Sequence, residues 1–355
     1  LFESNLKVGC YTSPHINKFN ERICINKKEV SDSQIVKAIH YVESSRANTS
    51  LTFFEITTLA AMKIFISNKV DICVLEVGLG GRLDAVNIFD PIISLISSIS
   101  IDHQEYLGNS IEKIGFEKAG ILRSKVPGIL NLKKIPRSII NYGNEICAKL
   151  FYFEKNYSLK IRKDTLIYES DLKKKILIKS PPFISKVQKQ NIAGAIKCIE
   201  ILSESFSIND DEIKKGIEMS VIRGRFEIVS KEPLVICDVA HNYESTKNLI
   251  ENFKKYKNIG PTRAVFSTLK DKEYEKIIKL FDLVDEWYIS ELKCTRGLKI
   301  NELQKTIKKN HLTSKIYTYL TIKNAYESAL ENSKENDNIL IFGSFHTIDE
   351  SGVIN

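Results

Sequence analysis

Hydrophobic and polar positions in the first half of the chain alternate between the period of a strand and that of a helix. Residues 72–77 (ICVLEV) and 92–99 are largely apolar runs. Runs of this kind are typical of strands buried in a parallel sheet. Apolar residues from Phe53 to Ile64 recur at helical spacing, so a helix is expected before the first of these strands.

Further elements are predicted toward the middle of the chain. Asn109, with Glu112 three residues later, matches a capping arrangement and predicts the start of a helix. Residues 151–179 alternate in short runs, which predict antiparallel strands at the edge of a first domain. A long helix is expected over residues 186–205, and a shorter one is expected to start near Asn209.

A second alternation of strands and helices begins near residue 226. Its apolar runs are residues 234–237, 263–266, 286–289 and 339–342. They predict a Rossmann-like α/β unit of about 130 residues. We therefore expect an α/β chain of two domains, residues 1–224 and 225–355, with a cleft between them. Neither domain has G-x-G-x-x-G after its first strand, which disfavours a nucleotide-dependent dehydrogenase.

Composition narrows the class of protein. Apolar residues make up 43% and charged residues 27% of the chain, as in a soluble globular protein. No apolar run approaches the roughly 20 residues that span a bilayer. The seven cysteines are scattered, so free thiols and a cytoplasmic protein are expected. The net charge of +8 comes from lysines dispersed among glutamates, which suits an anionic small molecule better than nucleic acid.

Candidate chemistry is found at the ends of the first two predicted strands. Glu76 is followed by a glycine-rich stretch, residues 77–81, of the kind that brings a metal or a phosphate close to backbone. Such a stretch is as often only a turn. Asp84, by itself, is typical of a surface or capping position. His103 closes the strand over residues 92–99, which we expect to neighbour the strand of Glu76 in one sheet.

Other candidates lie on a helix and in the second domain. Lys118, on its pattern alone, is typical of a helix-surface lysine. Asp238 ends a buried strand and is followed by His241 and Asn242, which open a helix. An acid in this place holds a ribose hydroxyl or caps the turn. Arg225 lies thirteen residues before Asp238, at a position from which it can contact phosphate.

Eight ordered segments resemble folylpolyglutamate synthase and dihydrofolate synthase, members of the Mur ligase superfamily. The segments are residues 11–23 (YTSPHINKFNERI), 52–58 (TFFEITT), 76–87 (EVGLGGRLDAVN), 102–103 (DH), 117–121 (EKAGI), 224–227 (GRFE), 238–242 (DVAHN) and 342–347 (FGSFHT). They extend over nearly the whole chain, and together they are far more specific than any one motif. The resemblance implies a Mur-ligase central, P-loop-like α/β domain followed by a smaller glutamate ligase domain.

The resemblance also implies a chemistry. Ligases of this family use ATP to phosphorylate a carboxylate of dihydropteroate, of tetrahydrofolate or of both, and the amine of L-glutamate then attacks the acyl phosphate. Two Mg²⁺ ions neutralise the phosphates. Ser13 and Glu76 would bind one ion and His103 the other. Lys118 matches a lysine that the family carries as a carbamate, and His241 is expected near the phosphoryl group or the glutamate.

The same resemblance implies binding residues. Pterin-binding positions are Thr52, Phe53, Phe54, Glu55, Leu83, Asp84 and Ala85. ATP-binding positions are Gln188, Asn191, Arg225 and Asp238, and Ser344 is expected near the glutamate. Phe54 can stack on a flat heterocycle, and Asp84 can accept hydrogen bonds from the N–H groups of that heterocycle. The expected partners are these small molecules, and a monomer without membrane or nucleic-acid contacts is expected.

One family segment is expected to be missing. The family's phosphate loop, G-T-x-G-K-G-S/T, lies roughly 25 residues before the Thr-Ser-Pro-His motif, and Leu1 stands eleven residues before Thr12. We therefore expect an N-terminally truncated chain that lacks this loop and turns over little by itself. Two alternatives stay open. They are a different Mur ligase, which needs an N-terminal UDP-binding domain, and a non-catalytic folate-binding relic.

Overall fold

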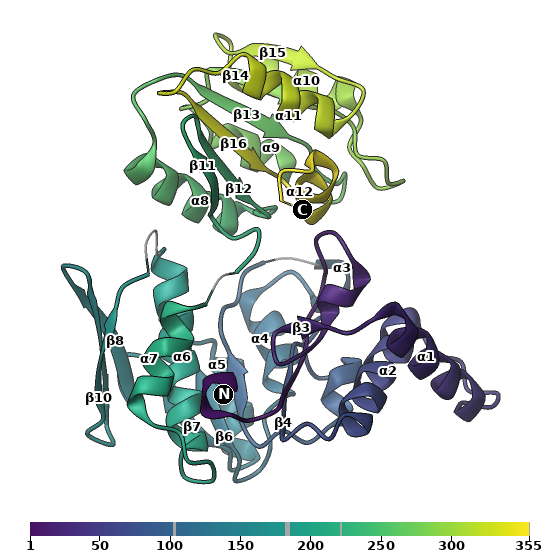
Figure 1. The fold of residues 1–355 in the computed structure, drawn as a ribbon, viewed down its shortest axis with the longest axis vertical. Coiled ribbons are helices and arrows are strands. Elements are labelled where there is room, and N and C mark those ends of the chain that lie inside the picture. The colour runs from purple at the N-terminus through teal and green to yellow at the C-terminus, as the bar shows by residue number, and fades with distance from the viewer. Residues whose placement is uncertain (102–103, 182–184, 221, 355) are drawn as a thin grey trace. The chain divides into compact units, whose positions relative to one another are not determined.

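The computed structural model describes residues 1–101, 104–181, 185–220 and 222–354. The chain divides into two compact units, residues 1–220 and 221–355, and both are α/β (Figure 1). The domain boundary expected between residues 224 and 225 stays a prediction. Among the described residues, no helix is long and apolar enough to cross a membrane. All seven cysteines are free thiols, as predicted.

The first sheet of unit 1 has the strand order β3-β2-β1-β4, in which only β1 and β4 are parallel. The elements of this region are η1 (Phe2–Ser4), β1 (Val8–Tyr11), η2 (Phe19–Arg22), β2 (Ile23–Ile25), β3 (Lys28–Glu29), α1 (Asp32–Ser45), α2 (Phe53–Ser67) and β4 (Ile72–Leu75). Helices α1 and α2 lie side by side (Figure 1). The predicted strand is confirmed as β4, but Val74 is 45% exposed, because β4 ends the sheet and is not covered throughout.

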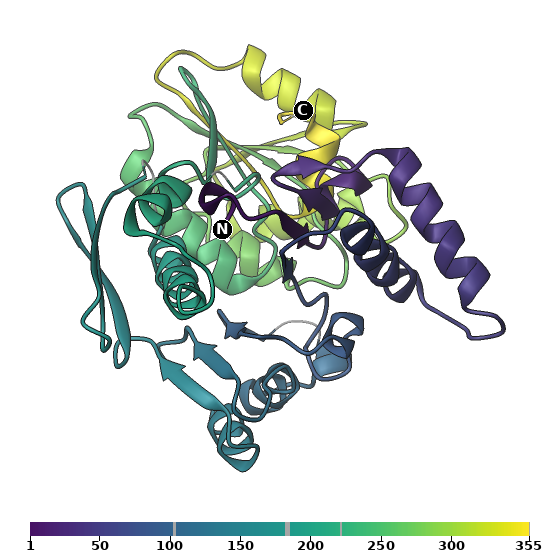
Figure 2. The ribbon, with the colours of Figure 1, turned by 60° about the horizontal axis from the view of Figure 1, so that its bottom comes forward.

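A second, fully parallel sheet of unit 1 has the order β5-β6-β7 (Figure 2). Its strands and the helices between them are β5 (Ser94–Ile96), α3 (Gln104–Leu107), α4 (Ile111–Ala119), β6 (Pro127–Leu130), α5 (Arg137–Glu145) and β7 (Lys149–Tyr152). Since β4 pairs with β1 and β5 with β6, the prediction that β4 and β5 are neighbours in one sheet is wrong. An apolar run indicates a strand, but it does not identify the neighbouring strand to which that strand is hydrogen-bonded.

The start of α4 also differs from the prediction. The N-cap is Ser110 rather than Asn109, and its Oγ accepts a hydrogen bond from the backbone N of Lys113 at 3.3 Å. The carboxylate of Glu112 instead accepts two backbone N–H groups at the start of α5. The expected pair is therefore replaced by a contact between two helices.

An antiparallel sheet of order β10-β9-β8 and two helices complete unit 1, as predicted. These elements are β8 (Tyr157–Arg162), β9 (Thr165–Ser170), β10 (Lys175–Lys179), α6 (Lys186–Leu202) and α7 (Asp210–Glu218). Asn209 and Glu212 form the capping box of α7. The fully buried Lys197 of α6 pairs with Asp171 and Glu200, each at 3.2 Å, and thereby ties α6 to the end of β9.

Unit 2 is one six-stranded sheet of order β11-β12-β16-β13-β14-β15, parallel except for β11. Its elements are β11 (Glu227–Lys231), β12 (Leu234–Asp238), α8 (Tyr243–Tyr256), β13 (Thr262–Phe266), α9 (Tyr274–Lys279), β14 (Glu286–Ile289), α10 (Ile300–Asn310), β15 (Lys315–Thr318), α11 (Ile322–Glu331), β16 (Asn338–Phe342) and α12 (Phe345–Ser351). The four predicted apolar runs are β12, β13, β14 and β16. Strands β12, β13 and β16 are buried along their whole length, as parallel strands between helices must be.

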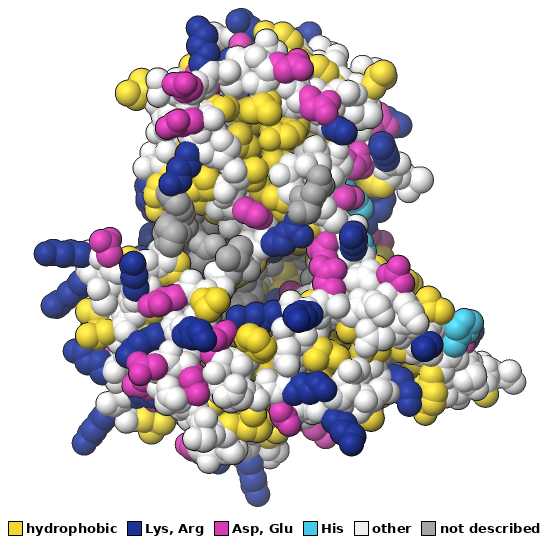
Figure 3. Space-filling model, viewed as in Figure 1, with side chains coloured by type: hydrophobic (Ala, Val, Ile, Leu, Met, Phe, Trp, Pro, Cys, Tyr) yellow, Lys and Arg dark blue, Asp and Glu magenta, His cyan; other side chains and the backbone are white. Residues whose placement is uncertain are grey.

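Charged side chains are mixed on the visible surface. On the described part of the face in Figure 3, Lys and Arg side chains stand among Asp and Glu in both units. This arrangement agrees with the dispersed lysines of the sequence.

Candidate active site

Ser13 and Glu76 meet at one edge of the first sheet. Ser13 follows β1, and Glu76 follows the parallel strand β4. The backbone N of Ser13 donates to Glu76 Oε2 at 2.8 Å, across 63 residues of sequence. The backbone N of Glu76 donates to the carbonyl of Tyr11 at 2.9 Å. The fold therefore brings two predicted metal ligands together at the carboxyl ends of two parallel strands.

This pair of side chains fits a hard divalent cation. A serine hydroxyl and a glutamate carboxylate supply the oxygen ligands that Mg²⁺ prefers, and this ion keeps waters and substrate phosphates as its other ligands. Among the residues that the structure describes, no group of three or more His, Cys, Asp and Glu side chains could hold a metal. His103, the other expected ligand, lies outside the described residues.

Glu21 holds the loop between β1 and β2 in one shape. Its carboxylate accepts the backbone N–H groups of Ile16, Asn17 and Lys18, at 2.8, 2.7 and 2.7 Å. Three hydrogen bonds to one ionised carboxylate are strong, charge-assisted contacts. These contacts stabilise the backbone of residues 16–18 in one conformation.

Three other side chains of the same loop, His15, Phe19 and Arg22, form a cluster. None of them was predicted individually as a site residue from the sequence. Arg22 Nε donates to His15 Nδ1 at 2.9 Å, and the guanidinium lies 5.5 Å from the ring centroid of Phe19. The Phe19 ring in turn meets Phe53 of α2 edge-on, at 5.8 Å between centroids. The only signal in the sequence was the crowding of these residue types in YTSPHINKFNERI.

The glycine-rich loop after β4 lies against α4. The backbone N of Arg82 donates to the carbonyl of Glu117 at 2.8 Å. A Cβ at Gly81 would come within 2.8 Å of that carbonyl and 3.2 Å of Lys118 Cα. Gly80 has a φ of +70°, which L side chains rarely adopt. Glycine is therefore required here, and Lys118 lies next to the loop.

Lys118 differs from a surface lysine in its environment. Its side chain is half-buried at the end of α4. Burial lowers the pKa of the ammonium group, and the negative charge of Asp84 opposes that shift. A lower pKa increases the neutral fraction of the amine, which is the nucleophilic form.

The first predicted pterin segment opens α2. Thr52 and Glu55 form its capping box, in which Thr52 N donates to Glu55 Oε2 at 2.6 Å. The half-buried Phe54 ring covers Gly78, where a Cβ would come within 2.6 Å of it. Phe53 is 64% exposed. Phe53 therefore presents the more open aromatic ring, although Phe54 lies closer to the glycine-rich loop.

The second predicted pterin segment is the turn after that loop. Asp84 accepts hydrogen bonds from Leu79 N at 2.8 Å and from Val86 N at 3.0 Å. It thereby caps η3 (Ala85–Ile88), the capping role that its position alone suggested. Leu83 is 80% exposed. Contacts of these residues with a pterin stay a prediction.

The two ATP-binding positions expected in unit 1 lie at the start of α6. Gln188 forms a capping box with Ser185, whose backbone N donates to Gln188 Oε1 at 2.8 Å. Asn191 is exposed, one turn further along the helix. The sequence therefore places both amides on the first two turns of a rigid helix.

In unit 2, the GRFE and DVAHN motifs are hydrogen-bonded to each other. Asp238 accepts from Phe226 N and from Ala240 N, both at 2.8 Å, and Val239 N donates to the carbonyl of Gly224 at 2.9 Å. Asp238 is 8% exposed, and burial raises its pKa to about 6. The first role of Asp238 is therefore to brace this turn.

Arg225 and His241 both lie against Phe345. The guanidinium carbon of Arg225 is 5.8 Å from the Phe345 ring centroid, and the His241 ring is 6.3 Å from it. His241 Nδ1 is 2.9 Å from the carbonyl of Val239. Because a carbonyl only accepts, Nδ1 carries the proton in this contact. Ser344 is 4% exposed and caps α12.

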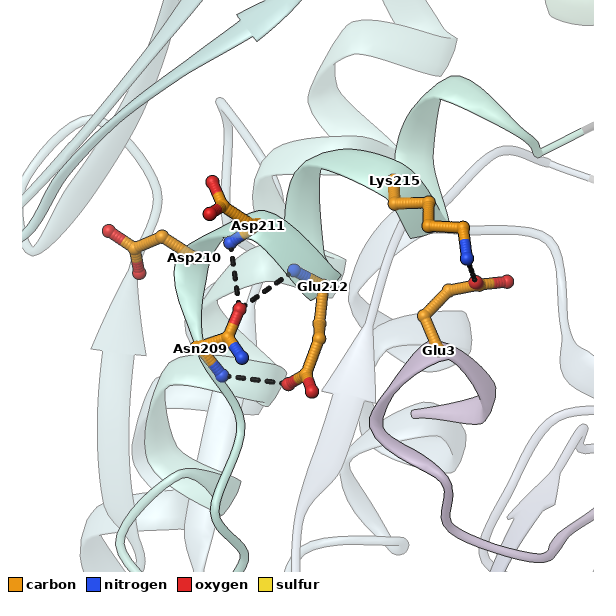
Figure 4. Close-up of a pocket in the computed structure, with 6 residues that line it drawn as sticks. All are labelled: Glu3, Asn209, Asp210, Asp211, Glu212 and Lys215. Carbon is orange, nitrogen blue, oxygen red and sulfur yellow. Dashed lines mark hydrogen bonds and ion pairs between the residues drawn. The ribbon is translucent and has the colours of Figure 1, made fainter.

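A separate cavity of about 380 Å³ lies in unit 1 and contains none of the predicted site residues. Figure 4 shows its lining, which consists of Glu3, Asn209, Asp210, Asp211, Glu212 and Lys215. Asn209 and Glu212 are engaged in capping α7, and Glu3 pairs with Lys215 at 2.8 Å. Asp210 and Asp211 pair with Lys174 and Lys214, which are not part of the lining. Each of these groups therefore has a partner, and the cavity offers no candidate chemistry.

Comparisons with known proteins identify the class of this fold. Residues 25–199 match the family model described as Mur ligase middle domain. Residues 224–345 match the model described as Mur ligase, glutamate ligase domain. The chain therefore has the two-domain architecture of a Mur ligase, which confirms the fold expected from the resemblance.

Individual relatives narrow the class to a family. A dihydrofolate synthase/folylpolyglutamate synthase of Escherichia coli (strain K12) is 34% identical over 351 residues, which cover 98% of this chain and 80% of the relative. The structure of E. coli FolC in complex with DHPP and ADP has a TM-score of 0.91 at 31% identity, and covers 98% of this chain and 81% of that one. A bifunctional folylpolyglutamate synthase/dihydrofolate synthase from Yersinia pestis, complexed with AMPPNP and Mn ion, has a TM-score of 0.88 at 30% identity, with 98% and 82% covered. The chain belongs to the dihydrofolate synthase/folylpolyglutamate synthase family.

Proposed function

We propose that the chain is an ATP-dependent ligase that adds L-glutamate to dihydropteroate, to tetrahydrofolate or to both. The observation that carries the proposal is the Ser13–Glu76 pair at the sheet edge, in a chain that matches this family over nearly its whole length. Relatives bound to DHPP and ADP, and to AMPPNP and Mn ion, support it. So does the glutamate ligase model that matches unit 2.

The reaction has two displacement steps. A carboxylate oxygen of the acceptor attacks the γ-phosphorus of ATP, the bond to the bridging oxygen breaks, and ADP leaves. The glutamate amine then attacks the carbonyl carbon of the acyl phosphate. Phosphate leaves and the nitrogen loses a proton, which gives the amide. We assign His241 to this second step, near the phosphoryl group or the incoming glutamate.

Ser13 and Glu76 would hold one Mg²⁺, and His103 a second. The ions would supply neutralisation of the phosphate charges. The contribution of the chain is to fix the oxygen ligands at the end of a rigid sheet, so that the acceptor and the γ-phosphate are held in line. The hydrogen bond from the backbone N of Ser13 to Glu76 supports this assignment, because it brings the two residues together.

Lys118 is proposed to be carbamylated. The ammonium first loses a proton. The neutral Nζ then attacks CO₂, a nitrogen–carbon bond forms as one C=O π bond of CO₂ opens to C–O⁻, and a second proton leaves, so that the side-chain charge changes from positive to negative. Such a group can sit beside a cation, which an ammonium cannot. The half-buried position and the lowered pKa of Lys118 support this assignment, since both favour the neutral amine.

The remaining assignments concern binding. We propose that the pterin is bound by Thr52, Phe53, Phe54, Glu55, Leu83, Asp84 and Ala85. The nucleotide would be bound by Gln188, Asn191, Arg225 and Asp238, and the glutamate would lie near Ser344. Residues 1–224 and 225–355 would form the two domains, in a monomeric enzyme of the cytoplasm.

A coupled assay for ADP release tests the function. The chain is expressed with whatever coding sequence precedes Leu1 in its gene, and is supplied with Mg-ATP, L-glutamate and either dihydropteroate or tetrahydrofolate. ADP release that requires both glutamate and a pterin substrate is expected. Binding of dihydropteroate without any ADP release would contradict the ligase and support a folate-binding relic.

A further inference from the structure

The backbone on both sides of Arg225 is left-handed. Gly224 has a φ of +65° and Phe226 a φ of +50°. Glycine adopts this conformation readily, whereas a phenylalanine in it is strained and keeps it only where neighbouring contacts hold the chain. Gly224 and Phe226 are buried and Arg225 is exposed, so the turn presents the arginine from a packed base.

Two carboxylates hold this turn, one on each side of Arg225. Glu227 Oε2 accepts a hydrogen bond from Gly224 N at 2.7 Å. Asp238 Oδ2 accepts one from Phe226 N at 2.8 Å. Hydrogen bonds from backbone N–H groups to a carboxylate are among the strong ones in proteins. The backbone is therefore held at the residue before Arg225 and at the residue after it.

The two carboxylates come from paired strands. Glu227 is the first residue of β11 and Asp238 the last residue of β12, and Glu227 lies opposite Cys237 in this antiparallel pair (Figure 1). Burial raises the pKa of the Cys237 thiol, and the negative charges of Glu227 and Asp238 add to that shift. Both carboxylates therefore lie at the same end of the strand pair, and the sheet sets the position of the turn.

Glu227 differs from Asp238 in what else it holds. Asp238 also accepts Ala240 N at 2.8 Å, so it braces the segment after β12 as well as the turn. The hydrogen bond that Glu227 accepts lies within the turn itself, at the residue next to Arg225. Loss of the Glu227 carboxylate should therefore disturb Arg225 more selectively than loss of Asp238.

The direction of the Arg225 side chain matters because a guanidinium binds phosphate through a planar fork of N–H groups. We propose that Glu227 is a positioning residue, which holds Gly224 N and thereby sets the direction in which Arg225 meets the phosphates of the nucleotide. The proposal rests on the proposed function, in which Arg225 binds the nucleotide. Glu227 touches no substrate in this role and acts only through Arg225.

The test is a double-mutant cycle between Glu227 and Arg225, measured as affinity for AMPPNP by isothermal titration calorimetry. The variants are Glu227→Met, Arg225→Met and the double variant. Glu227→Gln is the conservative variant, because its amide oxygen can still accept Gly224 N–H. Glu251→Met, at an exposed glutamate of α8 in the same unit, is the matched control. Each protein is made with whatever coding sequence precedes Leu1, and thermal unfolding shows whether it is folded.

Glu227→Met is expected to weaken AMPPNP binding about fivefold, as the loss of one hydrogen bond to a charged group. The affinity for dihydropteroate should change less than about twofold on the same scale. Glu227→Gln should lose only about twofold, because a neutral acceptor is weaker than a carboxylate. Glu251→Met should match wild type.

The double variant carries the main result. Arg225→Met alone is expected to weaken AMPPNP binding about tenfold or more. Adding Glu227→Met to it should cost less than about twofold, because the contact that Glu227 positions is already lost. If Glu227→Met does not fold, Glu227→Gln decides the question, since its smaller loss must also vanish in the Arg225→Met background.

Three outcomes would overturn the proposal. Additive losses in the double variant would show that Glu227 acts independently of Arg225. An equal loss for AMPPNP and dihydropteroate would make Glu227 a general support of the fold. Unchanged AMPPNP affinity in Glu227→Met, including a wild type that does not bind AMPPNP, would remove the role altogether. Failure of the ligase itself is seen separately, as absence of ADP release in a wild type that binds AMPPNP.

Discussion

Glu76 in unit 1 and Asp238 in unit 2 both stand at the end of a parallel strand, but their environments differ. Glu76 is exposed, and it accepts the backbone N–H of Ser13. Asp238 is 8% exposed, and each of its oxygens accepts a buried backbone N–H at 2.8 Å. A buried acid bonded in this way braces the backbone, whereas an exposed acid remains open to a cation. Access to solvent, rather than position on the strand, separates the two roles.

The largest effect is expected at Glu76. Glu76→Gln keeps the size of the side chain but removes its charge, so the rate of ADP release should fall about hundredfold or more. The free energy of unfolding should change by less than about 0.5 kcal/mol, as for most surface substitutions. Steady-state kinetics, Mn²⁺ titration and thermal unfolding measure these quantities.

The matched control is Glu29→Gln, at an exposed glutamate of β3 in the same sheet. It should leave rate, Mn²⁺ affinity and stability unchanged. Full activity and wild-type Mn²⁺ affinity in Glu76→Gln would remove Glu76 from the metal site.

The opposite pattern is expected at Asp238. Asp238→Ala leaves two buried N–H groups without acceptors, which should lower the free energy of unfolding by about 2 kcal/mol. The single tryptophan, Trp287, is fully buried in unit 2, so its fluorescence during denaturant titration reports this unit. An unchanged midpoint would show that the carboxylate is not a brace.

The pH dependence of the same residue sharpens the comparison. Burial raises the pKa of Asp238 from 3.8 to about 6, so the unfolded chain releases this proton at lower pH than the folded chain. The contribution of Asp238 to the free energy of unfolding should therefore decrease as pH rises from about 4 to about 6. The difference between wild type and Asp238→Asn across that window isolates this contribution. A difference that is independent of pH would refute it.

A smaller loss is expected at Lys118. Lys118→Arg cannot form a carbamate, and ADP release should fall about tenfold. Because only the neutral amine reacts, the ¹³C signal of a carbamate formed from ¹³CO₂ should increase with pH in the wild type and be missing in the variant. Lys113→Arg, at an exposed lysine of the same helix, is the control and should keep both the signal and the rate. A wild type that is fully active after CO₂ removal, with no carbamate signal, would exclude the modification.

The smallest effect is expected at Glu21, which acts only by positioning the loop. Glu21→Gln replaces an acceptor oxygen by a donor and should raise the KM for dihydropteroate severalfold with little change in kcat. Amide exchange at Ile16, Asn17 and Lys18, which donate to Glu21, should become faster. Unchanged exchange at these three amides would show that the loop is held by other contacts.

Much of the fold could be predicted from the sequence, because it depends on local patterns. The four apolar runs of unit 2 appear as strands, and the run over residues 286–289 has the bounds of β14. The capping box of Asn209 and Glu212 was recognisable because both partners lie within one turn. Strand pairing was not predictable, since β4 and β5 look alike in sequence and yet belong to different sheets. The capping pair predicted at Asn109 and Glu112 was wrong for the same reason. Glu112 accepts a hydrogen bond from the start of a helix 25 residues away in sequence.

The sequence by itself determined the family and the residue types of the candidate site, because ordered motifs such as EVGLGGRLDAVN and DVAHN are readable without a fold. Only the tertiary structure decided which side chains meet solvent and which brace the backbone. The Ser13–Glu76 contact joins residues 63 positions apart, and the burial of Asp238 depends on packing within unit 2. Burial and hydrogen-bond partners are properties of contacts between distant segments, which no local pattern records.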